Sequence, residues 1–102
     1  MKKNILITLL IFFYTFNIFA NEPKLDQIIN GLDNPWSLTF VDNENVLITE
    51  KSGNLLLVNL SNKNIGKIEH NLNILEDGQG GLLEVLYYKD QVFVSYTENQ
   101  KK

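Results

Sequence analysis

The chain has 102 residues, no cysteine, a formal net charge of −3 and a hydrophobic content of 44%. The lack of cysteine excludes a disulfide framework and a thiolate metal site, and the negative charge excludes a strongly basic nucleic-acid binder. Six phenylalanines, four tyrosines and one tryptophan, with many aliphatic side chains, provide the apolar surface for a folded core that disordered chains lack.

The first 20 residues have the layout of a secretory signal peptide. Two lysines precede an apolar run over residues 5–16, and the small residue Ala20 stands at the expected cleavage site. A transmembrane helix is the alternative, but it needs about 20 apolar residues, and this run is shorter and ends before Asn17. We therefore predict a signal peptide over 1–20, periplasmic or secreted location, and a mature domain over 21–102 without a membrane span.

The mature part is more acidic than the whole chain. Without the two leader lysines, seven lysines remain against 12 acidic residues, which gives a net charge of −5. Such a charge favours solubility and gives no reason to expect nucleic acid or an anionic membrane surface as a partner.

From Trp36 onward, apolar stretches of about six residues alternate with Asn, Asp, Ser and Gly. These polar residues and glycine favour tight turns, so the pattern predicts an all-β meander, and no 3.6-residue helical period persists. The expected strands cover residues 37–41, 45–50, 54–60, 66–70 (a weaker outer strand), 82–88 and 91–97.

The first two strands resemble the last two at an offset of 45 or 46 residues. A repeat of this length, about four strands, is typical of β-propeller blades, although a meander can also resemble itself by chance. One blade and two further strands fill the mature chain, whereas propellers close with roughly 4–8 blades. We therefore expect an N-terminal piece of a longer protein, because an isolated blade and a half would expose an apolar sheet face and strand edges.

A glycine-rich segment, Glu76–Leu83, is the clearest candidate for a binding site. Its three glycines allow positive φ angles and close approach of a flat ligand, and Gln79 among them offers two hydrogen-bond donors and an acceptor. An ordinary turn between blades is the alternative. The segment lacks the Gly-Lys-Ser/Thr ending of a phosphate-binding loop and the strand and helix of a dinucleotide fingerprint.

The other candidate residues favour structural roles. Trp36 is predicted to pack in the core between blades, with stacking at a pocket mouth as the alternative. The only histidine, His70, is predicted to be a surface residue rather than a base or ligand. Asp42, Glu44 and Glu50 do not have calcium-loop spacing and are interpreted as turn and strand-end residues, so no metal ligand is assigned.

Three segments together resemble the N-terminus of the glucose/sorbosone dehydrogenase family: Asn34–Phe40, Leu47–Gly53 and Gly78–Leu83. The resemblance extends from about Leu32 to Thr97 and is most specific in the Gly-Gln-Gly-Gly-Leu-Leu segment. It implies a six-bladed β-propeller, of which this chain would form the first blade and the start of the second.

The resemblance also implies an activity. Members of this family are soluble, periplasmic oxidoreductases that depend on pyrroloquinoline quinone (PQQ) and oxidise aldose sugars at the anomeric carbon to lactones. Gln79 matches the family's active-site glutamine, and Gly80 beside it would leave room for the cofactor. The family's catalytic histidine, its cationic PQQ-binding residues and its calcium ligands lie in later motifs, so this chain would be inactive alone and an electron acceptor would act on the full-length protein.

Some residues depart from the family pattern. Lys51 replaces a frequent arginine, residues 42–45 replace a Pro-Asp-Gly turn, and residues 87–90 replace a His-Pro-Asp-Phe segment. These changes weaken any inference about which sugar is oxidised. A non-catalytic propeller or meander that binds proteins or glycans, or a small secreted β-protein, therefore stays as an alternative.

Overall fold

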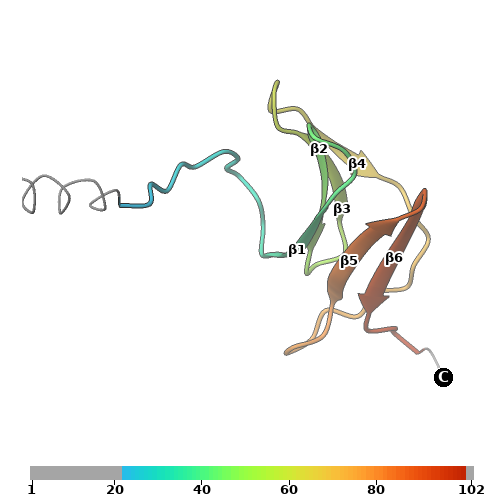
Figure 1. Cartoon of the computed structure of the whole chain (residues 1–102). Coiled ribbons are helices and arrows are strands. Elements are labelled where there is room, and N and C mark those ends of the chain that lie inside the picture. The colour runs from blue at the N-terminus through green and yellow to red at the C-terminus, as the bar shows by residue number, and fades with distance from the viewer. Residues whose placement is uncertain (1–21, 101–102) are drawn as a thin grey trace, which may run out of the picture.

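The computed structural model describes residues 22–100, and this part of the chain contains six β-strands and no helix (Figure 1). The strands are β1 (Pro35–Phe40), β2 (Asn45–Glu50), β3 (Leu55–Asn59), β4 (Ile65–Ile68), β5 (Leu82–Tyr88) and β6 (Gln91–Tyr96). All six predicted strands are confirmed, and β1 and β4 are each displaced by one or two residues toward the N-terminus. The predicted signal peptide lies outside the described residues.

The first four strands form an antiparallel sheet in the order β1-β2-β3-β4, and β5 and β6 form a separate hairpin. Turn chemistry explains the connections. The Asp42 carboxylate accepts the backbone N–H groups of Glu44 and Asn45, each at 2.8 Å, which confirms its predicted role in the turn. Lys89 and Asp90 have positive φ angles of 49° and 60°, as a two-residue hairpin turn between twisted strands requires.

The strand alternation places apolar side chains on both faces of the four-stranded sheet. One face carries a buried cluster covered by residues of the extended chain before β1, and the opposite face packs against the β5-β6 hairpin. The first cluster consists of Val46, Ile48, Leu56 and Val58, with Ile29 and Leu32 packed against it. The second consists of Leu47, Leu55, Leu82 and Val85. The sheet therefore packs with one face against the hairpin, and its other face is covered in part by the extended chain.

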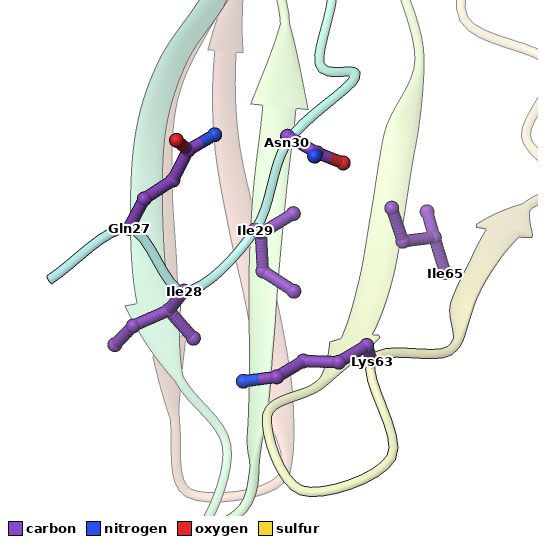
Figure 2. A pocket seen from close by; sticks show the side chains of 6 residues that line it. All are labelled: Gln27, Ile28, Ile29, Asn30, Lys63 and Ile65. Carbon is purple, nitrogen blue, oxygen red and sulfur yellow. The ribbon is translucent and has the colours of Figure 1, made fainter.

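A shallow pocket lies between the extended chain and the edge of the first sheet. Figure 2 shows the side chains of residues 27–30 beside Lys63, from the turn between β3 and β4, and Ile65 of β4. The pocket has a volume of about 350 Å³. None of the residues of the glycine-rich segment lines it, so it is separate from the candidate site.

Two apolar surfaces stay open to solvent. The β1 side chains Leu38 and Phe40 are 57% and 58% exposed, and the paired side chains Leu86 and Phe93 of β5 and β6 are 56% and 50% exposed. Leu38 pairs with buried Ile48 on the face away from the hairpin. The open surfaces are thus the two outer faces of the two-layer stack.

Candidate functional site

The glycine-rich segment lies at one end of the first sheet, where β1 and β3 begin and β2 ends. Lys51, directly after β2, brings the surrounding chain segments together. Its backbone N–H donates to the Asn34 carbonyl at 3.0 Å, and its carbonyl accepts the N–H of Leu82 at 3.0 Å. Lys51, in the turn after β2, therefore holds both the residue before β1 and the first residue of β5.

Gln79 lies in a tight turn from Asp77 to Gly80. The Gly80 N–H donates to the Asp77 carbonyl at 2.8 Å, and the Asp77 N–H donates back to the Gly80 carbonyl at 3.3 Å. Gly78 has a φ of 56°, at the first central position where a type II′ turn places glycine. The turn leaves the Gln79 side chain exposed at this end of the sheet.

Contacts on two sides hold this turn. On one side the Lys51 ammonium donates to the Gly78 carbonyl, and a Cβ on Gly81 would collide with the Lys51 carbonyl. On the other side Thr97 donates its N–H to the Gly81 carbonyl at 2.9 Å, and a Cβ on Gly80 would lie 2.8 Å from the Thr97 hydroxyl. Close packing against Thr97 therefore explains why position 80 is a glycine, apart from its predicted role near a cofactor.

Glu50, the last residue of β2, binds two neighbouring segments at the same end of the sheet. Its buried carboxylate accepts the Asp33 N–H at 2.6 Å and the Asn54 side-chain amide at 2.8 Å. The sequence correctly placed Glu50 at the end of a strand, but no local signal indicated its burial, because one partner is 17 residues away. Glu50 and Lys51 are the residues of this site that the sequence did not identify.

The prediction that Trp36 packs in the core is wrong for the part of the chain that the structure describes. Its side chain is 44% exposed and lines a groove of about 370 Å³ with Leu32, Leu38 and Ile48 among its neighbours. The pairing of β1 with β2 is irregular between Pro35 and Ser37, so Trp36 lies at a bulge. Its face of β1 is the open one.

His70 is confirmed as a surface residue. Its Nε2 lies 2.7 Å from the Gly53 carbonyl, and its Nδ1 accepts the Leu72 N–H at 3.3 Å. The ring bonds to the backbone through both of its nitrogens. His70 thus ties the loop after β4 to the turn between β2 and β3.

Two features are absent from residues 22–100. No group of three His, Cys, Asp or Glu side chains there is arranged to hold a metal ion. No helix in the same range is long and apolar enough to cross a membrane.

Residues 32–102 match the family Glucose / Sorbosone dehydrogenase. The chain belongs to this family. A search of curated proteins gives no match. Among solved structures, a glucose dehydrogenase is 36% identical, with a TM-score of 0.69 over 78% of this chain and 25% of its own. The soluble aldose sugar dehydrogenase of Escherichia coli, in its apo-form, is 31% identical, with a TM-score of 0.63 over 72% of this chain and 23% of its own.

The PQQ-bound aldose sugar dehydrogenase of Streptomyces coelicolor shares the fold, with a TM-score of 0.67 and 20% identity over 74% of this chain and 25% of its own. The chain thus spans about a quarter of the length of these solved structures. Its strands match the start of their β-propeller, which confirms the predicted first blade and opening of the second.

Proposed function

We propose that this chain forms the first blade of a periplasmic or secreted, PQQ-dependent aldose dehydrogenase that oxidises sugars at the anomeric carbon to lactones. Membership of the family supports the reaction class. The observation that carries the proposal is the exposed Gln79 amide on a turn held from two sides. Later blades would supply the catalytic histidine and the cations for the PQQ carboxylates, so the chain alone would be inactive.

The residues of the turn fit one part of a quinone site. When bound, PQQ supplies the two-electron redox chemistry. The Gln79 amide can donate to a quinone or carboxylate oxygen and accept from a sugar hydroxyl. The position of a Cβ on Gly78 has no atom within 4 Å, which leaves space for a flat ring beside the turn. Gln79 would therefore orient ligand atoms, while proton removal would belong to a residue of another blade.

Within residues 22–100 no group of three His, Cys, Asp or Glu side chains is arranged to hold a calcium ion. We propose that any calcium ligands come from later blades. The physiological electron acceptor would likewise meet the completed propeller, and an artificial dye can replace it in an assay.

Substitution of Gln79 tests the proposal in the longest natural polypeptide that contains this chain, called the complete protein below. Gln79→Ala should lower kcat/KM at least about tenfold in glucose-dependent dye reduction with added PQQ and calcium, because a transition-state hydrogen bond is lost. Gln91→Ala removes an exposed amide at the start of β6 and should leave turnover unchanged. Equal activity of both variants and the wild type would show that Gln79 is not an active-site residue.

Export is a separate part of the proposal. The leader pattern predicts cleavage after Ala20, so the mature protein in the extracytoplasmic fraction should begin at Asn21. N-terminal sequencing of the protein recovered from that fraction checks this. An uncleaved protein in the cytoplasm would contradict both the leader and the periplasmic location.

A further inference from the structure

Lys51 contacts the Gln79 turn through its side chain as well as its backbone. The backbone carbonyl holds the N–H of Leu82 at the end of the turn, and the ammonium group holds the Gly78 carbonyl near the tip. The Lys51 Cγ also lies 2.7 Å from the position of a Cβ on Gly81. One residue of the turn after β2 thus grips the glycine-rich segment at three of its positions.

We propose that Lys51 is a positioning residue that fixes the direction of the Gln79 side chain through the bond from its ammonium to the Gly78 carbonyl. This inference rests on the proposed function for its effect on catalysis. The peptide that carries the Gly78 carbonyl is the one that joins Gly78 to Gln79. Holding that carbonyl therefore limits rotation of the peptide plane from which Gln79 projects, at a glycine whose backbone is otherwise permissive.

The side-chain contribution can be separated from the backbone contribution. Substitution of Lys51 leaves its bonds to Asn34 and Leu82 intact, because both use backbone atoms. Lys51→Met keeps most of the aliphatic stem and removes the charged donor, whereas Lys51→Arg restores a donor of similar reach. Lys67→Met, at an exposed position of β4, removes a lysine outside the turn and is the matched control.

Hydrogen exchange in the unliganded complete protein gives a readout that does not depend on activity. Lys51→Met should speed amide exchange at Gly80, whose N–H closes the turn, by roughly five- to tenfold, because a hydrogen bond to a charged donor is lost. Exchange in β2 and β3 should not change, and Lys51→Arg and Lys67→Met should match the wild type. Unchanged exchange at Gly80, or a uniform increase over β2, β3 and the turn, would overturn the inference.

Kinetics then connects the position of the turn with turnover. Lys51→Met should lower kcat with little change in KM, and the double variant with Gln79→Ala should be no slower than Gln79→Ala alone, because both act through one amide. Additive losses would show that Lys51 acts elsewhere and would overturn the inference. Faster exchange at Gly80 with no quinone-dependent turnover even in the wild type would refute the proposed function and leave the hold of Lys51 on the turn established.

Discussion

Gly81 is the residue at which the glycine-rich segment and the turn after β2 come closest. Its φ is 155°, and an added Cβ would collide with the Lys51 carbonyl. Gly81→Ala should therefore lower the free energy of unfolding of the complete protein by about 2 kcal/mol, measured by urea denaturation. Gly66→Ala is the control, because its Cβ would meet only the Leu57 carbonyl at 3.8 Å. Equal stability of the two variants would contradict the close packing at Gly81.

Asp42 gives the turn between β1 and β2 a pH dependence. Hydrogen bonds from the Asn45 side chain, and then from the backbone of Glu44 and Asn45, lower the pKa of its carboxyl below the ordinary 3.8. The hydrogen bonds of the ionised Asp42 carboxylate therefore stabilise the fold. Because the folded-state pKa is depressed, this stabilisation is fully present above the unfolded-state pKa and is lost as pH falls through the folded-state pKa. An NMR titration of the Asp42 carboxyl should give a midpoint below 3.8, and a midpoint at or above that value would contradict the turn.

Local chemistry explains which of these residues the sequence could identify. Asp42 and the glycines beside Gln79 are predictable, because turn residues act on neighbours within a few positions. The grip of Lys51 on Gly78 joins residues 27 positions apart, and nothing near Lys51 in the sequence indicates it. Trp36 is exposed in this part of the chain although large aromatic residues are buried on average, because the pairing of β1 places it on the open face of the sheet.

At the scale of elements, Thr49 joins three strands. Its hydroxyl is fully buried, donates to the Leu83 carbonyl of β5 at 2.5 Å and accepts the Ser37 N–H of β1 at 3.2 Å. Thr49→Val preserves shape and removes both bonds, so the free energy of unfolding should fall by about 1–3 kcal/mol. Thr39→Val removes one bond, to the Tyr87 N–H at a half-buried position, and should have a smaller effect in the same urea titration. A larger loss at Thr39 would show that the Thr49 hydroxyl does not join the blades.

Strand positions were predictable because each apolar run is bounded by turn residues. The displacement of β4 has a pairing reason. Ile68 pairs with Leu55, the first residue of β3, so Glu69 and His70 have no strand residue opposite them. The weaker strand expected over 66–70 therefore ends at Ile68, and the length of its neighbour rather than its own composition sets its end.

At the scale of the whole molecule, the two open faces decide how the chain behaves. Phe40 and Phe93 lie on opposite outer faces of the stack and are 58% and 50% exposed. Burial of such side chains is worth about 2 kcal/mol each. Packing of further layers against them would therefore stabilise the folded protein. A family member that spans about a quarter of its solved relatives would meet such layers in the other blades of the propeller.

The same substitution should have opposite effects in two contexts. In residues 21–102 alone, Phe93→Lys should reduce self-association, measured by sedimentation velocity, because it places a charge on an open apolar face. In the complete protein, where we expect the next blade to cover β5 and β6, Phe93→Lys should lower the free energy of unfolding by about 3 kcal/mol. Asn62→Lys, at an exposed turn between β3 and β4, should be neutral in both contexts. If residues 21–102 form a soluble, cooperatively unfolding monomer and Phe93→Lys is neutral in the complete protein, the face is a free surface and the propeller assignment of β5 and β6 fails.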